Sequence, residues 1–513
     1  MRHLRRLREL ATAHQGLPLL WIALTVVALA PIWSQRLLPH VDMPNHLALV
    51  RGWHNYDNPA YRISEFFDLR IRPVPYIGFY ATLHWMMYAV TIETAYKIFL
   101  SAYVVLFPLS VLSLSRALGR SPWMAVMAFP LIFSQCWVYG FASYLLGLTL
   151  LVFGFATLIR YYDSGSQRQL ALLFVLSFLT YFFHILPWAC LGLTFMTLAV
   201  LHPDRYHRTL VAALALTPSL ALAIYSTAAE RAANVYFVET RPEMIAFWAD
   251  FPTSLKDFST RVSGLFPGYI DDACTFVLLG CVVAMLIWQR VKYGAQPRDL
   301  TARRLHALAV VFFFAYLALP VEIKNPIKWF YIAQRLPTFI MILLLLRPSV
   351  PMARTRLLFV VPAIVFAIVL PLKLVKLYRS FSTRNMGFIH LVQEVPIGGT
   401  CLVVPRGMRP SMTMDPVAMG PVYDHLGSWP MALRGGYDHF AFDQGVPIRP
   451  KKRLGTPNFW SADTFDFRQA PEYEYYLVRN PPAVMRREPA LRVIDEAGEW
   501  TLFHRAHDLT DEP

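Results

Sequence analysis

The chain has 513 residues, of which 56% are hydrophobic and 16% are charged, and its mean hydropathy is +0.40. Several apolar runs are long enough to cross a bilayer, which excludes an ordinary soluble domain and predicts a polytopic helical membrane protein. The net charge of +15 does not indicate a nucleic-acid partner, because Lys and Arg lie in short loops between apolar runs, where they signal topology.

Apolar runs predict about eleven membrane-spanning helices within residues 17–376, after a basic tail at 1–16. The sequence Ala28-Leu29-Ala30 resembles a signal-peptide cleavage site, but Pro31 follows it directly and disfavours processing. The first run is therefore expected to remain as a helix. The predicted spans are residues 17–38, 95–115, 122–139, 144–160, 168–185, 187–201, 209–227, 274–289, 304–320, 336–347 and 356–375.

The aromatic segment Pro75–Val90 is apolar enough to cross the membrane, although it contains His84. Counting it as a span would place the arginines of several later loops outside. A helix or hairpin lying in the interface instead places those arginines inside, together with the basic tail, as the positive-inside rule favours. The N-terminus is then cytoplasmic, and the long loops at residues 39–94, 228–273 and 321–335 face outward.

Beyond residue 377 the composition changes to mixed polar residues with Pro and Gly. Short β-like runs occur at Cys401–Val404, Tyr473–Val478 and Leu491–Ile494. This pattern predicts that residues 377–513 form a small extracytoplasmic α/β or α+β domain.

The first polar stretch after the first span is Pro39–Leu47, with the sequence PHVDMPNHL. Asp42 directly before Met43-Pro44 is a helix-start signal, so its carboxylate could simply cap a helix. In such a helix Asp42 and His46 share one face, where the carboxylate could also act as a general base toward an acceptor. His40 and His46 are candidate substrate-binding groups beside it.

The layout of the first part of the chain resembles a known class of membrane enzymes. An acidic outward loop and an aromatic segment precede a span that ends in Ser115-Arg116-Ala117-Leu118-Gly119-Arg120. This arrangement looks like the GT-C class of integral membrane glycosyltransferases, which includes protein mannosyltransferases, aminoarabinose transferases and oligosaccharyltransferases. The resemblance covers residues 1–120 and the overall plan, and it implies an all-α polytopic membrane domain.

The resemblance also implies a site and a donor. In these families an acidic residue of the first outer loop serves as the base or binds the reacting groups, and Asp42 alone matches that position. The loop has neither an adjacent Asp-Glu pair nor a D-x-D motif. No metal ligands are therefore assigned, and a divalent metal cofactor is left open. The implied donor is a polyprenyl-phosphate sugar, and its acceptor is not identified.

A phosphate donor requires a cation near the outer surface of the membrane. Arg335, just before the tenth predicted span, resembles the basic residue that such enzymes place in their last outer loop, and Lys324 and Lys328 could assist it. The alternative is that Arg335 extends to lipid headgroups, as flanking arginines often do.

Two further residues are candidates for substrate binding. His184 ends the fifth predicted span, where an ionisable group suggests a function, although a histidine bonded to a neighbouring helix is equally ordinary. Tyr139 lies in the turn between the third and fourth spans. The glycines of that turn, Gly140 and Gly147, favour helix packing over substrate contact.

The sequence therefore predicts a multi-pass protein of a bacterial inner membrane that moves a sugar from a polyprenyl-phosphate donor to an acceptor at the outer face. Two alternatives belong to other classes. One is a lipid or polysaccharide transporter or flippase, which would be expected to carry charged or broken helices near the bilayer midplane, often in two related halves, and neither feature is found. The other is a noncatalytic membrane assembly protein that binds a partner through its tail. Beyond donor, acceptor and membrane lipids, no partner is indicated.

Overall fold

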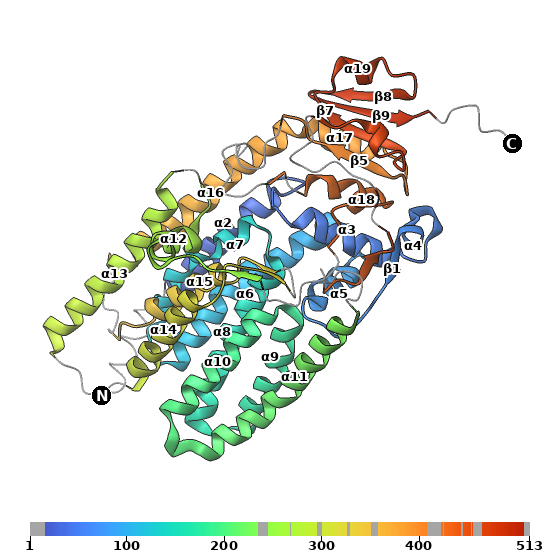
Figure 1. Cartoon of the computed structure of the whole chain (residues 1–513). Helices are drawn as coiled ribbons and strands as arrows, with labels where there is room; N and C mark the ends of the chain where they lie inside the picture. The colour runs from blue at the N-terminus through green and yellow to red at the C-terminus, as the bar shows by residue number, and fades with distance from the viewer. Residues whose placement is uncertain are drawn as a thin grey trace.

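The computed structural model describes residues 16–233, 245–266, 268–294, 300–325, 329–349, 358–407, 422–423, 425–442, 445–452, 454 and 464–506. A bundle of apolar helices forms most of the molecule, and a small β-sheet region caps one end of it (Figure 1). The helices of the bundle are α2 (Leu17–Trp33), α6 (Ile92–Ala117), α8 (Ala142–Ser164), α9 (Gln167–Phe183), α10 (Ile185–Leu201), α11 (Tyr206–Ala233), α13 (Ile270–Tyr293), α14 (Leu300–Ala318), α15 (Pro337–Leu345) and α16 (Val361–Arg384).

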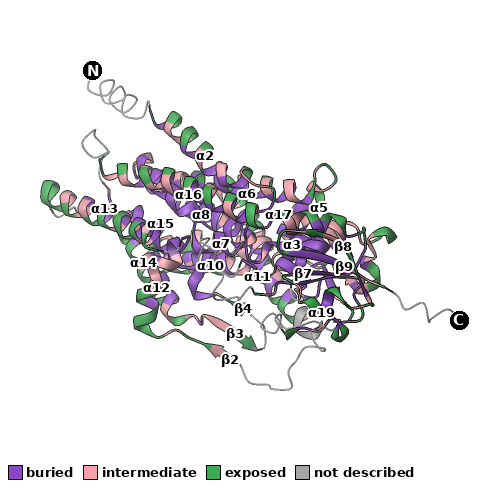
Figure 2. Ribbon diagram, turned by 90° about the horizontal axis from the view of Figure 1, so that it is seen from above, coloured by how far each residue is buried: buried purple, intermediate pink, exposed green. Residues whose placement is uncertain are grey.

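Six helices in the described ranges are long and apolar enough to cross a membrane, and five shorter apolar segments accompany them. Each predicted span coincides with one of these segments, whereas the number that cross the bilayer stays a prediction. The central helix α8 is buried along most of its length, while α11 and α13 expose large apolar side chains (Figure 2). Helices with apolar outer faces are what a lipid environment requires.

The third predicted span is not the regular helix that residues 122–139 suggested. It consists of a 3-10 helix, η2 (Pro122–Ile132), followed by the single turn α7 (Gln135–Val138). Pro130 lies inside η2, and proline lacks the N–H that a regular helix needs. The segment is buried on all sides, which explains why its sequence is apolar without a polar face.

The segments between the helices gather at one end of the bundle, here named the α3 end after α3 (Met43–His54). Beside α3 lies α5 (Ile77–Met86), which spans about 15 Å at 1.5 Å per residue and is too short to cross a bilayer. Helix α12 (Phe251–Ser263) lies near a three-stranded antiparallel sheet of β2 (Ile245–Phe247), β3 (Glu322–Asn325) and β4 (Trp329–Phe330). The short elements η1 (Pro59–Tyr61), α4 (Ile63–Phe66) and η4 (Ala333–Arg335) belong to this end. At the opposite end, η3 (Pro203–Arg205) connects α10 to α11.

The C-terminal part contains the predicted strands in a four-stranded sheet with the order β5-β7-β9-β8. Strands β5 and β7 are parallel and the other pairs are antiparallel. Its strands are β5 (Cys401–Val404), β7 (Tyr475–Arg479), β8 (Leu491–Ala497) and β9 (Trp500–Arg505), and its helices are α17 (Met386–Glu394), η6 (Leu426–Ser428), α18 (Trp429–Arg434), η8 (Phe467–Gln469) and α19 (Ala483–Arg486).

This C-terminal part interlocks with the first loop rather than standing apart from it. Strand β6 (Ile448–Pro450) pairs with β1 (Phe67–Leu69). The side-chain amide of Asn45 donates to the Phe440 carbonyl at 2.6 Å and accepts from the Phe442 amide at 3.2 Å. Two segments almost four hundred residues apart in the sequence thereby become one wall of the α3 end.

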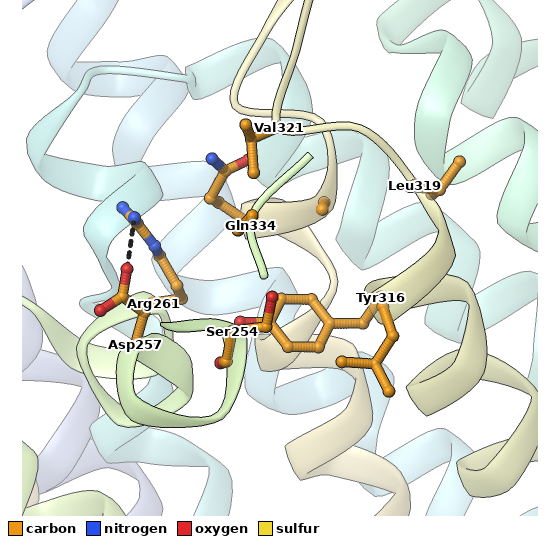
Figure 3. Close-up of a pocket in the computed structure, with 10 residues that line it drawn as sticks. Ser254, Asp257, Arg261, Tyr316, Leu319, Val321 and Gln334 are labelled. Carbon is orange, nitrogen blue, oxygen red and sulfur yellow. Dashed lines mark hydrogen bonds and ion pairs between the residues drawn. The ribbon is translucent and has the colours of Figure 1, made fainter. Parts of the chain in front are cut away.

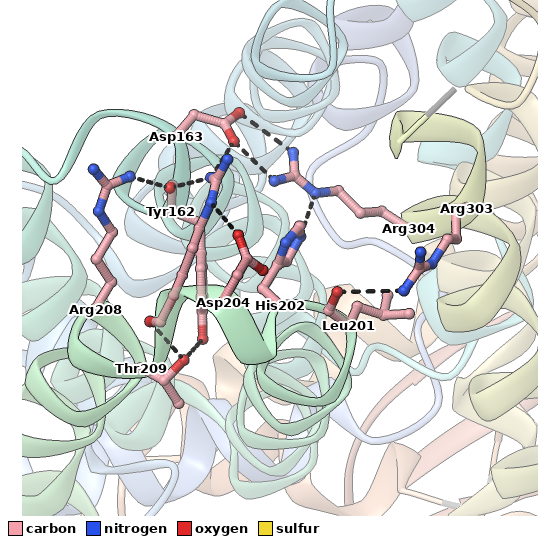
Figure 4. Close-up of polar contacts among 10 residues, drawn as sticks. Tyr162, Asp163, Leu201, His202, Asp204, Arg208, Thr209, Arg303 and Arg304 are labelled. Atoms are coloured by element: carbon pink, nitrogen blue, oxygen red, sulfur yellow. Dashed lines mark hydrogen bonds and ion pairs between the residues drawn. The ribbon is translucent and has the colours of Figure 1, made fainter. Parts of the chain in front are cut away.

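A charged cluster ties the helices together at the opposite end of α8, α10 and α14 (Figure 4). The Asp163 carboxylate pairs with Arg304 at 2.8 Å and with Arg205 at 3.0 Å. Arg304 also donates from Nε to His202 Nε2 at 2.9 Å. Charged groups at this end and polar loops at the other leave the apolar middle of the bundle between them.

Gly140 allows the turn before α8 to approach the first loop, and its replacement should destabilise the fold. Its φ is +75°, and an added Cβ would lie 2.9 Å from Met43 Cγ and 3.0 Å from His40 Cβ. We expect Gly140→Ala to lower the free energy of unfolding by about 2–4 kcal/mol, combining backbone strain with a steric clash. Gly119→Ala is the matched control, because Gly119 has a φ of +64° but open space around its Cβ position. Thermal unfolding in detergent measures both; equal losses would show that the close approach at Gly140 is unimportant.

Candidate active site

Asp42 is held where the first loop meets the turn before α8. The Asp42 amide donates to the Tyr139 carbonyl at 3.0 Å, and the Val41 amide donates to the Val138 carbonyl at 3.2 Å. Asp42 occupies the N-cap position of α3, but its side chain does not cap the helix by a hydrogen bond to an amide of the first turn. Capping therefore does not account for this carboxylate.

His425, which the sequence did not single out, lies beside this carboxylate. Its Nε2 is 3.6 Å from Asp42 Oδ1, and its buried Nδ1 has no hydrogen-bond partner among the described residues. His46 Nδ1 is 2.6 Å from the Tyr80 hydroxyl, and its ring packs against Phe442. Burial lowers the pKa of His425 to about 4, and burial with nearby positive charge lowers the pKa of His46 to about 3. Both rings are thus neutral at pH 7.

Arg335 is buried without a carboxylate partner. The residue is 7% exposed, and no ion pair joins it to a described Asp or Glu. The guanidinium stacks over the Phe141 ring at 4.1 Å, and its buried Nε has no hydrogen-bond partner in the described structure. A buried cation with an unused donor is unfavourable unless an anion reaches it, so this geometry suits a phosphate.

His184 reinforces this arrangement from the start of α10. Its Nδ1 lies 3.1 Å from the Leu186 amide nitrogen, and its Nε2 lies 2.8 Å from Nη1 of Arg335. A neutral imidazole accepts at one nitrogen only, so these two donors compete for the same ring. The guanidinium therefore keeps donor capacity for an acceptor such as a phosphate oxygen.

Aromatic residues connect the part of the site around Asp42 with the part around Arg335. The Tyr80 hydroxyl lies within electrostatic range of Asp42 and of Tyr76, and Tyr76 in turn lies within range of Arg335. Tyr76 has a φ of +74° and Tyr331 one of +57°, an uncommon backbone conformation for bulky residues. Tyr331 packs on Tyr139 with 4.5 Å between ring centroids. Backbone strain of this kind clusters at functional sites.

The other predicted residues are placed differently. His40 is buried, and both of its ring nitrogens contact tyrosine hydroxyls, Tyr96 at 2.5 Å and Tyr378 at 3.2 Å, as in a structural core histidine. Lys324 is exposed and lies 3.7 Å from Glu322, so it is not brought into the cluster. Lys328 falls outside the described residues. The site thus unites Asp42, His46, Tyr139, His184 and Arg335.

Within the described ranges, no three His, Cys, Asp or Glu side chains converge in a way that could hold a metal ion.

Comparisons with known proteins agree with this architecture. No family model and no curated protein sequence matches the chain. Among solved structures, ArnT from Cupriavidus metallidurans bound to undecaprenyl phosphate matches with a TM-score of 0.56 at 10% identity, covering 97% of this chain and 99% of that one. The apo state of the same enzyme matches with a TM-score of 0.53 at 10% identity, covering 96% and 98%.

The chain has a GT-C-like fold. The coverage extends over nearly the whole of both chains, so the likeness includes the C-terminal part as well as the helices. Together with the apolar helices, it makes the protein a multi-pass integral membrane protein.

The neutral histidines should make the fold acid-sensitive. Between pH 6.5 and about 4 the unfolded chain binds protons that His46 and His425 of the folded chain do not, so stability falls as the pH decreases. At pH 5 the loss is roughly 2 kcal/mol for each ring. The double variant His46→Asn and His425→Gln should lose less stability between pH 7.5 and 5 than the wild type does. Melting temperatures across this range test it, with His390→Gln as the exposed control; parallel curves would contradict it.

Proposed function

We propose that the protein is a glycosyltransferase that moves a sugar from a polyprenyl-phosphate donor to an acceptor at the outer face of the membrane. The observation that carries the proposal is the buried Arg335, which has an unused Nε donor and lies within electrostatic range of His46, one turn along α3 from Asp42. The undecaprenyl phosphate bound by the ArnT structure supports a lipid phosphate as its ligand.

Each side chain then has a defined task. Asp42 removes the proton from the acceptor group, whose freed electron pair attacks the anomeric carbon of the donor sugar. The bond from that carbon to the phosphate oxygen breaks, and the lipid phosphate leaves with the electron pair. Arg335 stabilises the charge that develops on it, and His184 adds a second donor when the proton of its ring is on Nε2. His425, neutral and beside Asp42, orients the carboxylate.

Asp42→Asn should lower turnover, whereas Arg335→Lys should weaken lipid-phosphate binding. Loss of a general base typically lowers the rate about 100- to 10,000-fold, so Asp42→Asn should abolish most turnover while undecaprenyl phosphate still binds. Arg335→Lys keeps the charge but loses the planar fork, so it should weaken that binding. The measurements are binding to undecaprenyl phosphate in nanodiscs and consumption of a radiolabelled polyprenyl-phosphate sugar.

The exposed Asp57→Asn and Arg168→Ala serve as controls. Donor consumption by Asp42→Asn at the wild-type rate would refute the assignment of the base. Wild-type protein that binds the lipid but never consumes the donor would favour a transporter or an assembly protein.

The proposed orientation can be tested with single cysteines. Arg492 is exposed on β8 and Arg168 is exposed at the start of α9, at opposite ends of the molecule. Four of the five native cysteines are buried and the fifth is half-buried, so background labelling should be low. A membrane-impermeant maleimide should label Arg492→Cys in intact spheroplasts and Arg168→Cys only after permeabilisation. The reverse pattern would place the α3 end in the cytoplasm.

A further inference from the structure

The charged cluster at the end of the bundle opposite the α3 end carries an excess of positive charge (Figure 4). It contains four arginines and two aspartates, which leaves a net charge of +2: Asp163, Asp204, Arg205, Arg208, Arg303 and Arg304. His202 beside them adds no charge at pH 7, because burial and the adjacent Arg304 and Arg205 lower its pKa. The cluster as a whole therefore attracts an anion.

The positive charge is not shared evenly among the arginines. The two aspartates pair with Arg205 and Arg304, at distances of 2.8 to 3.7 Å. No ion pair joins Arg208 or Arg303 to an Asp or Glu of the described ranges. The excess charge therefore lies on Arg208 of α11 and on Arg303 of α14, which are on opposite sides of the cluster (Figure 4).

Both of these arginines keep hydrogen-bond donors for a ligand. Arg208 donates from Nη1 to the Tyr162 carbonyl, and Arg303 donates from Nη2 to the Leu201 carbonyl at 3.4 Å. A guanidinium has five N–H donors, so a single contact of this kind leaves most of them available. Arg261, beside the small hollow drawn in Figure 3, differs because a neighbouring aspartate pairs with it at 3.1 Å. An arginine whose planar fork has no such carboxylate suits a phosphate group.

The cluster lies about one bilayer thickness away from the α3 end. Helix α8 begins at Ala142 near the candidate active site and ends at Ser164, next to Asp163. Its 23 residues span about 34 Å at 1.5 Å per residue, whereas the hydrocarbon core of a bilayer is about 30 Å thick. When the α3 end lies at one membrane surface, the cluster therefore lies among the lipid headgroups of the other surface.

Apolar faces lead from these arginines toward the middle of the bundle. On α14, Val310 and Phe314 follow Arg303 by seven and eleven residues, which places all three on one face of the helix, and all three are exposed. Helix α11 likewise exposes Leu210 and Leu214 within two turns of its own arginine. Exposed apolar side chains in this position suit an acyl chain, so a phosphate that carries acyl chains fits better than a free phosphate ion.

We infer that Arg208 and Arg303 each bind the headgroup phosphate of an anionic phospholipid at the membrane surface opposite the α3 end, independently of the reaction proposed for the α3 end. Basic groups between membrane helices are typical sites for such headgroups. The net charge of +2 favours a lipid whose headgroup is negative overall over a zwitterionic lipid. The bound lipids thus neutralise the charge that the two aspartates of the cluster leave uncompensated.

The test compares lipids that differ in charge. The full chain is reconstituted in nanodiscs that mix phosphatidylglycerol with phosphatidylcholine, and native mass spectrometry counts the lipids of each kind that it retains. Wild-type protein should retain phosphatidylglycerol in preference to phosphatidylcholine. Arg208→Gln and Arg303→Gln should each weaken the retention of one phosphatidylglycerol roughly fivefold, and the double variant should lose most of the preference. Excess inorganic phosphate should not displace the lipid, because it lacks acyl chains.

Arg487→Gln combined with Arg492→Gln is the matched control, because both arginines are exposed in the C-terminal part and no ion pair joins them to a described Asp or Glu. Arg303→Gln keeps the test decisive if Arg208→Gln fails to fold, since Arg303 is exposed and its side chain has one described hydrogen bond, to Leu201. Equal retention of the two lipids by wild-type protein would overturn the inference. So would a preference that survives the double variant, or displacement of the lipid by inorganic phosphate.

Discussion

The arrangement of the α3 end depends on a buried positive charge that no described carboxylate neutralises. Arg335 is held by stacking on Phe141 and by its contact with His184, and neither removes its charge. An isolated buried cation opposes folding, so it persists only where the surrounding structure determines its position and a ligand can supply the countercharge.

The first loop and the C-terminal part build the surroundings of Asp42 together. Asn45 forms hydrogen bonds with the backbone of Phe440 and Phe442, and β1 pairs with β6. These contacts hold the C-terminal part against the first loop, so that His425 lies beside Asp42. On the other side, η4 positions Arg335 beside His184. A candidate base and a candidate anion site thus share one end of an apolar bundle, while charged residues tie its opposite end.

The sequence predicted the features that depend on local patterns. Apolar run length located the helices, and short β-like runs located β5, β7 and β8. A helix-start pattern and the family resemblance singled out Asp42, and the resemblance singled out Arg335. The sequence did not predict the features that depend on packing between distant residues. Nothing near His425 in the sequence shows that it meets Asp42, and the apolar letters of residues 122–139 do not reveal a 3-10 helix. His40 and His46 look alike in the sequence. Only their partners in the folded protein show that His40 is a core histidine and that His46 lies near Asp42.

The central claim is that Arg335 and His184 form an anion site. The most direct measurement is an experimental map of the full chain in a nanodisc with undecaprenyl phosphate added. We expect the phosphate to lie within hydrogen-bonding distance of both the Arg335 guanidinium and His184 Nε2, with the lipid chain leading away into the bilayer. A phosphate bound elsewhere, with Arg335 still packed on His184 as in the unliganded protein, would contradict the account.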